Sequence, residues 1–329
     1  MARLPVSYAG HVSDRTRPLH EGRVVPEGID LQFIPLPPVQ AFNRMLAGDF
    51  DCAEMSFATY VIKTGHGETP FVAIPVFPSR TFRHGAIYVH RRSGIEAPAD
   101  LVGRRVGVPE YQMTAAVWVR GLLKHEYGVE PEQIHWVTGG LTGPGRQPLA
   151  TLARQDLSIR HETAKGLNDL LAAGEIDALV APQVPPALHA PEGEVVRLFP
   201  DYPAVERAYF QKTRLFPIMH VMVLRRAFHE RHPWAAVSLF EAFEAARRLG
   251  MAELEAEEPL PISLPWIDHF ARSVRELMGP DYWPYGVEAN RREITAMCDY
   301  VWEQGLVPAR VAPVGLFAPN VLSAAKIRL

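Results

Sequence analysis

Short apolar runs alternate with segments of helical periodicity through most of this chain. The runs expected to form strands are 4–9, 29–36, 50–55, 71–77, 85–90, 104–109, 134–139, 176–182, 195–200 and 220–226. The periodic segments expected to form helices in the same region are 39–48, 113–126 and 164–173. Strands that alternate with helices in this way predict an α/β protein with largely parallel sheets.

The last third of the chain changes to a mainly helical pattern. Pro233 stands where a helix would begin, a position that tolerates its missing N–H, and Gly250 is expected to close that helix. Two further helices are expected at 266–278 and at about 288–304. We expect these helices to cover a sheet and to carry no chemistry of their own.

Two polar or irregular stretches divide the chain. Residues 91–103 are polar and rich in turn formers, and 201–216 is expected to be irregular. We therefore predict one lobe made of 1–92 and 213–329, with 93–212 inserted as the second lobe. Two connecting segments favour hinge closure on a ligand, and a cleft between lobes is a preferred place for a small-molecule site.

Composition limits the range of partners. The chain has 329 residues, of which 47% are hydrophobic, and this suits two domains that each fill a core. Its 34 Lys and Arg against 37 Asp and Glu leave a net charge of −3, so nucleic acid is not expected as a partner. We expect a small-molecule ligand and no membrane partner, while a homo-oligomer stays open.

The two cysteines, Cys52 and Cys298, lie in apolar stretches and are expected to be buried thiols. The chain shows no Cys/His spacing typical of a metal site, and no metal or cofactor is expected. The apolar run after Met1-Ala2-Arg3 is too short for a secretory signal, and no run reaches the length of a membrane span. These features predict a cytoplasmic protein.

The segment with the strongest chemical signal is 78–90. The apolar strand 71–77 runs directly into Arg80, Arg83 and His84, and a second strand follows at once. Cationic side chains packed between two strands are poor for stability unless an anion lies there. Arginine forks match carboxylates in a bidentate way, and histidine adds a group that carries a proton near neutral pH.

Two further segments follow strands near the N-terminus. Arg15 lies in the loop after the first strand, where an α/β sheet binds its ligands, although Asp14 and Arg17 allow a purely structural ion pair. Glu54 lies near the end of another strand, and it is a proton donor if buried or a solvated carboxylate if not. Ser56 either caps the next helix or helps to bind an anion at its N-terminus.

Two more segments complete the set of candidates. Tyr111, Gln112 and Thr114 lie between a strand and a helix, where polar groups serve as caps or as ligand contacts. His220 lies where the chain returns to the first lobe, either facing the ligand or bonded to a backbone carbonyl in the core. The sequence alone leaves both alternatives open.

With these segments placed, the chain resembles the 4,5-dihydroxyphthalate decarboxylase family. The strings that carry the resemblance are DRTRPL at 14–19, FDCAEMSFATY at 50–60, VFPSRTFRHGAIYV at 76–89, GVPEYQMTAAVW at 107–118, GEIDALVAP at 174–182 and FPIMH at 216–220. The resemblance implies a type II periplasmic-binding-protein-like fold with two α/β lobes. It also implies non-oxidative removal of one carboxylate from a dihydroxylated aromatic diacid, giving protocatechuate and CO2.

This activity suggests roles for the candidate residues. Arg80 and Arg83, together with Arg15, would hold the carboxylate that stays on the ring, while Tyr111 and Gln112 would orient the ring hydroxyls. The general acid would be His84 or His220, with Glu54 as a third candidate. Ser56 and Thr114 would contribute further substrate contacts.

Two other functions are open at this stage. A cytoplasmic protein that binds or senses an aromatic carboxylate without chemistry would use the same fold and the same arginines. A metal-assisted decarboxylase is a third option, and His11 with Asp14 would then be the ligands to inspect.

Overall fold

The structure is a computed structural model that describes residues 2–68, 70–145, 156–191, 193–255 and 262–326, without the side chains of the last four. Contacts divide the chain into two compact units, which are described separately below. The first unit comprises Met1–Arg80, Ile218–Ile294 and Ala312–Leu329, and the second comprises Thr81–Pro217 and Thr295–Val311.

The first unit is built on a five-stranded sheet with the order β2-β1-β3-β11-β4. Its strands are β1 (Leu4–Gly10), β2 (Ile29–Pro35), β3 (Cys52–Ser56), β4 (Phe71–Arg80) and β11 (Ile218–Arg225). Strand β1 pairs in parallel with β2 and β3, whereas β11 pairs antiparallel with both β3 and β4. Only β11 therefore runs against the other strands of this sheet.

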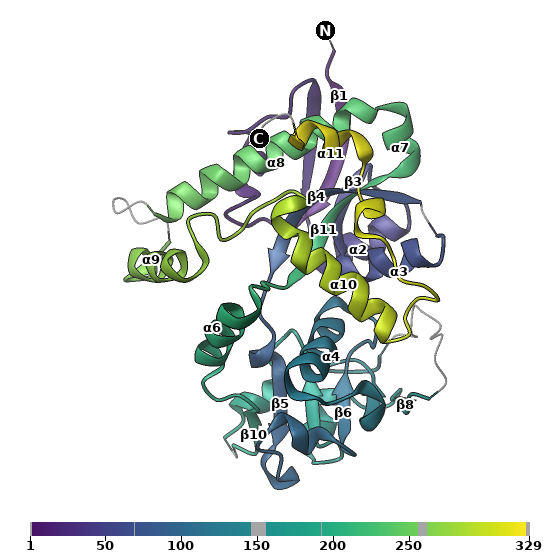
Figure 1. Ribbon diagram of the computed structural model, residues 1–329, viewed down its shortest axis with the longest axis vertical. Coiled ribbons are helices and arrows are strands. Elements are labelled where there is room, and N and C mark those ends of the chain that lie inside the picture. Colours follow the sequence, from purple (N-terminus) through teal and green to yellow (C-terminus); the bar gives the residue numbers. More distant parts are fainter. Residues whose placement is uncertain (1, 69, 146–155, 192, 256–261, 327–329) are drawn as a thin grey trace. The chain divides into compact units, whose positions relative to one another are not determined.

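The helices of the first unit are α1 (Arg17–His20), α2 (Pro38–Leu46), α3 (Phe57–Gly65), α7 (Arg226–Arg231), α8 (Pro233–Leu254), α9 (Ile267–Met278) and α11 (Pro319–Lys326) (Figure 1). Helix α9 was expected to cover a sheet, but it packs near α8 and has no buried residue. Helix α2 packs near β3, and α8 packs near β4, α1 and α11. Helix α10 (Arg291–Glu303) begins in the first unit and continues into the second.

The second unit is built on a six-stranded sheet with the order β10-β5-β9-β6-β7-β8. Its strands are β5 (Ile87–His90), β6 (Arg105–Val108), β7 (His135–Thr138), β8 (Ile159–His161), β9 (Ala178–Val180) and β10 (Val195–Arg197). Here only β5 is reversed, since it pairs antiparallel with β9 and β10 while the other pairs are parallel. The helices of this unit include α4 (Thr114–Tyr127), α5 (Leu167–Ala172) and α6 (Tyr202–Thr213).

The predicted fold class is confirmed. Each strand expected from the sequence is present, and each unit is a mostly parallel sheet flanked by helices. The apolar runs are buried as expected; in the second unit, for example, Leu167, Leu171 and Ile176 pack against Leu179 of β9. The short strand β8 was not expected, because its three residues Ile-Arg-His show no clear apolar pattern.

Two local predictions were wrong. The stretch 201–216, expected to be irregular, contains α6, whose N-cap Asp201 accepts a hydrogen bond from the Ala204 N–H. An Asp N-cap followed by a proline in the first turn is typical of a helix start. The segment was expected to be irregular because its apolar periodicity is weak. Gly250 does not end α8, which continues to Leu254.

The two units differ from the predicted lobes, 1–92 with 213–329 and 93–212, in three places. Strand β5 was assigned to the first lobe, but it pairs with β9 and β10 in the second sheet. Residues 213–217 and 295–311 also belong to the second unit. The chain therefore passes from the first unit to the second directly after β4, between Arg80 and Thr81. The polar stretch 91–103 lies within the second unit.

No helix in the part of the chain that the structure describes is long and apolar enough to cross a membrane.

Gly250 shows how closely α8 approaches the loop after β1. A Cβ atom placed on Gly250 would lie 2.1 Å from the carbonyl oxygen of Asp14 and 2.6 Å from its carbonyl carbon. Alanine is a better helix former than glycine by about 1 kcal/mol, yet overpacking of this kind costs roughly 1–3 kcal/mol. We expect Gly250→Ala to lower the free energy of unfolding, measured by urea denaturation.

Gly315 provides the matched control, because no atom lies within 4 Å of a Cβ placed there. Gly315→Ala should leave the free energy of unfolding within about 0.5 kcal/mol of the wild-type value, as for most surface changes. A Gly250→Ala protein that equals or exceeds the wild type in stability would show that the approach to Asp14 does not constrain α8.

Candidate functional site

The structure divides the predicted site residues between the two units. Those in the first unit are Arg15, Glu54, Ser56, Arg80 and His220, and those in the second unit are Arg83, His84, Tyr111, Gln112 and Thr114. Arg80 and Arg83, which the sequence places three residues apart, therefore belong to different units.

The reversed direction of β11 brings His220 to the ligand-binding edge of the first sheet. In an α/β sheet this edge is formed by the carboxyl ends of the parallel strands. Because β11 is antiparallel, its beginning lies beside the ends of β3 and β4, and His220 pairs in register with Ser56 and Ser79. A residue far along the chain thus joins the edge where β1, β3 and β4 end.

His220 and Glu54 form a close pair at this edge. The Nδ1 atom of His220 lies 2.7 Å from Oε1 of Glu54, and the other carboxylate oxygen of Glu54 accepts the backbone N–H of His11 at 2.9 Å. The two side chains are diagonal neighbours on one face, since Glu54 stands opposite Met222. The Glu54 side chain is only 2% exposed, whereas that of His220 is 18% exposed.

The environment of Glu54 favours its ionised form. Burial alone would raise the pKa of this carboxyl, but the hydrogen bond and charge of His220, with the His11 N–H, lower the pKa below its ordinary value. A carboxylate at this distance from Nδ1 fixes the orientation of the His220 imidazole.

Tyr8 of β1 lies beside this pair, although the sequence analysis did not single it out. Its hydroxyl is buried without a hydrogen-bond partner among the residues described, and a Cβ on Gly10 would lie 2.3 Å from it. Burial, and then the charge of Glu54, raise the pKa of this phenol. Nothing in the sequence distinguishes Tyr8 from an ordinary core aromatic, because it occupies a buried position in an alternating strand.

Arg15 lies at the same edge of the sheet. Its guanidinium donates to the Pro78 carbonyl through Nε and Nη2 at 3.3 and 3.1 Å, and Nη1 lies 2.5 Å from Asp14. It also stacks on the Trp283 ring, 3.9 Å from the ring centroid. The side chain keeps 15% of its surface exposed, so Arg15 is ordered by the protein and still accessible.

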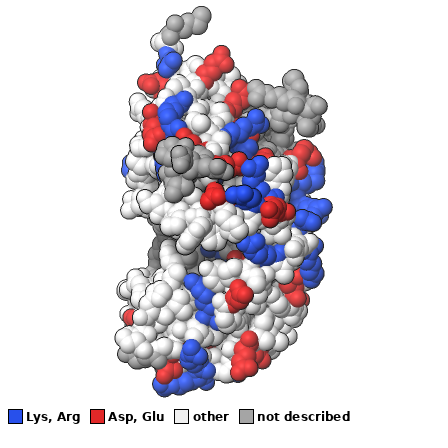
Figure 2. Space-filling model, turned by 90° about the vertical axis from the view of Figure 1, so that its left-hand side faces the viewer, with Lys and Arg blue, Asp and Glu red and all other residues white. Residues whose placement is uncertain are grey.

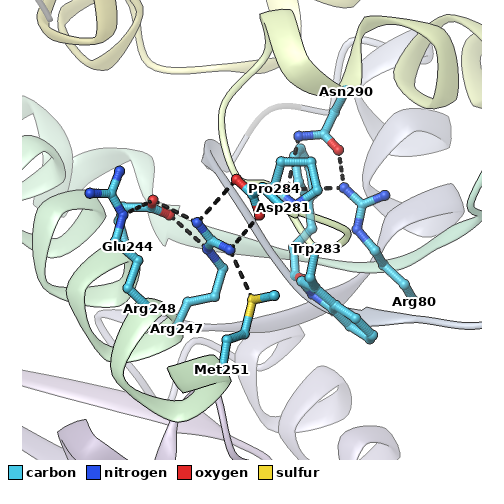
Figure 3. Close-up of polar contacts among 10 residues, drawn as sticks. Arg80, Glu244, Arg247, Arg248, Met251, Asp281, Trp283, Pro284 and Asn290 are labelled. Atoms are coloured by element: carbon cyan, nitrogen blue, oxygen red, sulfur yellow. Dashed lines mark hydrogen bonds and ion pairs between the residues drawn. The ribbon is translucent and has the colours of Figure 1, made fainter. Parts of the chain in front are cut away.

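Arg80 serves mainly to hold the segment 281–290 onto the sheet (Figure 3). Its Nη2 donates to Oδ1 of Asn290 and to the Pro284 carbonyl, and the Glu293 carboxylate lies 3.7 Å from Nη1. The side chain is 1% exposed. These contacts give Arg80 a structural role, and a direct contact with a ligand stays a prediction.

A second arginine holds the other end of the same segment (Figure 3). Arg247 of α8 donates to both Glu244 and Asp281 at 2.7 Å. Between the two anchors, the Trp283 indole N–H donates to the Phe77 carbonyl at 2.9 Å. The segment is therefore fixed at several points, which holds the Trp283 ring in place against Arg15.

Ser56 caps α3, as the simpler of its two interpretations predicted. Its hydroxyl accepts the Thr59 N–H at 3.4 Å and the Thr59 hydroxyl at 3.0 Å. Its contact with a ligand stays a prediction.

His84 lies in an apolar environment in the second unit. The residue is 1% exposed, and the rings of Phe199 and Tyr209 pack edge-on against it at centroid distances of 5.4 and 5.1 Å. Burial lowers the pKa of His84 to about 4, although the Glu206 carboxylate lies 4.0 Å from Nδ1. His84 is therefore neutral at pH 7.

Arg83 lies beside the same carboxylate. Burial lowers the pKa of Arg83 to about 10, so the side chain stays charged at neutral pH. The negative charge of Glu206 favours this charged form. Glu206 also accepts the Gly85 N–H at 3.2 Å. A cation with a carboxylate in its surroundings is less suited to grip a second anion, and the role of Arg83 as a carboxylate clamp stays a prediction.

Tyr111, Gln112 and Thr114 lie at the start of α4, where the chain leaves the carboxyl end of β6. All three are buried, and the Gln112 side-chain amide lies 3.4 Å from the Glu110 carboxylate. Their ligand contacts also stay predictions. The guanidinium of Arg120, which the sequence analysis did not consider, lies against the Tyr111 ring and carbonyl.

Within the described ranges, no group of three or more His, Cys, Asp or Glu side chains is placed to hold a metal ion. The backbone N–H of His11 donates to Glu54, while Asp14 lies against Arg15.

Acidic and basic side chains are interspersed on the face of the molecule shown in Figure 2. This mixture agrees with the net charge of −3.

Comparison with solved structures defines the class of fold. The chain resembles the periplasmic aliphatic sulphonate binding protein SsuA from Escherichia coli, with a TM-score of 0.52 and 16% identity over 97% of this chain and 99% of that one. It resembles the desulfurization enzyme DSZB with a TM-score of 0.55 and 17% identity over 99% of both chains. The protein therefore has a periplasmic-binding-protein-like fold, and residues 25–144 match a family model described as NMT1/THI5 like.

Sequence relatives narrow this class. A protein from Comamonas testosteroni named 4,5-dihydroxyphthalate decarboxylase is 37% identical over 330 residues, which cover 99% of this chain and 100% of the relative. A protein of the same name from Pseudomonas putida is 38% identical over 204 residues, covering 61% of this chain and 79% of that one. The chain belongs to the 4,5-dihydroxyphthalate decarboxylase family.

The depressed pKa of His84 makes stability depend on pH. The folded pKa of about 4 lies below the ordinary histidine value of about 6.5, so the unfolded chain binds more protons between these values. The contribution of His84 to stability is complete above about pH 6.5 and is lost as the pH falls through about 4. Between about pH 6.5 and 4, we expect the free energy of unfolding of the wild type to fall by about 2–3 kcal/mol more than that of His84→Leu.

The measurement is urea denaturation of both proteins at several pH values between 7 and 4. The difference between the two proteins removes the contribution of other titrating groups. Parallel pH profiles would show that the His84 ring is not held neutral by its surroundings.

Proposed function

We propose that the protein is a non-oxidative decarboxylase of a hydroxylated aromatic dicarboxylate such as 4,5-dihydroxyphthalate, releasing CO2 and protocatechuate. The observation that most supports this proposal is the His220–Glu54 pair, in which a buried carboxylate lies 2.7 Å from a histidine at the edge where the parallel strands of the first sheet end. Membership of a family whose curated relatives bear this name supports the substrate class.

The reaction requires a proton donor more than any other group. Direct loss of CO2 from an aromatic ring would leave an electron pair in the ring plane, where the π system cannot stabilise it. Protonation of the ring carbon that bears the carboxylate avoids this problem. The hydroxyl para to that carbon supplies electron density, so the chemistry itself does not demand a cofactor.

We assign the proton transfer to His220. Its ring N–H donates a proton to the carboxylate-bearing carbon, which forms a C–H bond with a pair of π electrons while the para oxygen shares the positive charge. The C–CO2 bond then breaks, its electron pair restores the aromatic ring, and CO2 leaves. His220 regains a proton from solvent, and Glu54 stabilises its charged form before the transfer.

His220 is a better general acid than the alternative, His84. A general acid must be protonated at the working pH and must reach the substrate. His84 is neutral at pH 7, because burial lowers its pKa to about 4, and it lies among aromatic rings. His220 has a carboxylate partner and partial exposure. Glu54 itself is poorly suited to donate a proton, because its lowered pKa keeps it ionised.

Arg15 is the best-supported contact for the carboxylate that stays on the ring. It lies at the same edge as His220 and Glu54, and Pro78 and Trp283 hold its guanidinium in place. A strong grip on the departing carboxylate would stabilise the substrate more than the transition state, which would lower the rate. We therefore assign Arg15 to the retained group.

The alternative function is an aromatic-carboxylate binding or sensing protein without turnover. The fold does not decide between the two, because the solved structures of similar fold include a binding protein and an enzyme.

Decarboxylation and passive binding give different outcomes with one substrate. The protein is incubated with 4,5-dihydroxyphthalate in oxygen-free D2O, in one sample with EDTA and in another without it. CO2 and the aromatic product are then measured. We expect CO2 and protocatechuate in equal amounts, with one deuterium at the carbon that lost the carboxylate. Binding without turnover would support the sensing alternative, and loss of activity only with EDTA would support a metal-assisted reaction.

His220→Asn tests the assignment of the acid. Removal of general acid catalysis typically costs about 10²–10⁴-fold in rate, so we expect kcat to fall by this factor. The affinity for protocatechuate, measured by calorimetry, should stay within a few-fold, because Asn keeps a polar group of similar size.

His84→Asn is the matched comparison, since the same substitution removes the alternative acid. We expect a kcat near the wild-type value at pH 7.5. A large loss in His84→Asn with little change in His220→Asn would reverse the assignment.

A further inference from the structure

Arg120 of α4 is a fully buried cation that neither the sequence analysis nor the proposed mechanism uses. Its residue exposure is 1%. Nε donates to Oε1 of Gln304 at 2.8 Å, and Nη2 donates to the Tyr111 carbonyl at 2.5 Å. The guanidinium carbon lies 3.6 Å from the centroid of the Tyr111 ring and 5.5 Å from that of Trp136.

The charge of Arg120 is not neutralised by the residues that the structure describes. Its two hydrogen-bond acceptors are a carbonyl and an amide oxygen, and no carboxylate of that part of the chain pairs with it. Nη1 is buried without any hydrogen-bond partner there. A buried ion without a counter-charge is costly, so this arrangement calls for a reason beyond packing.

The other buried arginines give a clear contrast. Arg247 binds Glu244 and Asp281, and Arg80 has Glu293 at 3.7 Å. Both arginines are accompanied by carboxylates of the protein. Among the described residues, Arg120 instead donates to neutral acceptors and forms no ion pair, so its charge can act on a bound anion.

The guanidinium of Arg120 lies at the N-terminal end of α4. Side chains of a helix tilt toward its N-terminus, and Arg120 reaches the carbonyl of Tyr111, nine residues earlier. Tyr111 belongs to the turn 109–113, which links the carboxyl end of β6 to α4. The N-cap of α4, Met113, provides no side-chain hydrogen bond. The partial positive charge of the helix end and the charge of Arg120 therefore act on the same turn.

We propose that the turn 109–113 and the first residues of α4 bind the carboxylate of an aromatic acid, with Arg120 as its counter-charge behind the turn. This inference rests on the proposed function for the choice of an aromatic acid as ligand. Arg120 is a positioning residue, since it holds the Tyr111 carbonyl and acts on the anion through a medium of low dielectric constant. The turn thus recognises a carboxylate in addition to ring hydroxyls.

A test must separate this electrostatic role from simple support of the turn. Binding is measured by calorimetry with three aromatic probes that the proposed reaction does not consume: phthalate, protocatechuate and the uncharged catechol. Arg120→Met keeps the length and apolar packing of the side chain but removes its charge. We expect the dissociation constants of the acids to rise about tenfold or more, a change of about 1.4 kcal/mol, with that of catechol changed less than threefold.

Arg105→Gln is the matched control, because it removes one positive charge from β6 of the same unit. Arg105 is an exposed arginine that already pairs with Asp177. Its replacement should leave all three dissociation constants unchanged. Arg120→Lys keeps the positive charge but lacks the planar guanidinium. Compared with Arg120→Met, it should retain most of the preference for acids over catechol, even if its melting temperature is lower than that of the wild type.

Equal weakening of the acids and catechol in Arg120→Met would overturn the inference and leave Arg120 as a scaffold. The inference would also be overturned if Arg120→Lys lost the preference for acids to the same extent as Arg120→Met. It would equally be overturned if the wild-type protein bound none of the acids. Wild-type protein that binds the acids but releases no CO2 from 4,5-dihydroxyphthalate would contradict the proposed function only. The two proposals therefore fail under different observations.

Discussion

The antiparallel pairing of β11 between β3 and β4 is the constraint on which the candidate site depends. All other strands of the first sheet run in one direction, so the sheet has a single edge that collects carboxyl ends. The reversal of β11 adds the beginning of a distant segment to this edge. In consequence, a histidine and a glutamate separated by 166 residues meet within hydrogen-bond distance. A one-residue slip in this register would turn His220 to the other face and separate the pair.

The buried arginines show how one residue type serves different purposes in one chain. Arg80 and Arg247 are matched with carboxylates and fix the segment that carries Trp283. This support keeps the Trp283 ring in place against Arg15, which holds the Arg15 guanidinium in one orientation. Arg120 differs because the described protein atoms near it are neutral acceptors and rings.

The fold by itself supports both binding and catalysis. It is shared with a sulphonate binding protein and with a desulfurization enzyme at identities that reflect the fold alone. What this chain adds is a histidine paired with a buried carboxylate, at the edge of the sheet where Arg15 is held against Pro78 and Trp283. The combination suits chemistry in which an anionic ring must gain a proton before it loses CO2. Membership of the decarboxylase family, from full-length relatedness, agrees with that chemistry.

The sequence by itself determined the class of fold and most elements, because apolar periodicity is local and survives without knowledge of the partners. It also singled out Glu54 and His220, one as a strand-end carboxylate and the other as a histidine at a crossover, but it could not join them. Their contact depends on strand register, which only the assembled sheet fixes. Tertiary structure likewise decided that burial makes His84 neutral and that Arg80 binds Asn290. It also decided that Arg120 is buried and has no carboxylate partner among the described residues. Burial and pairing are properties of neighbours brought together from distant positions, and a linear pattern does not contain them.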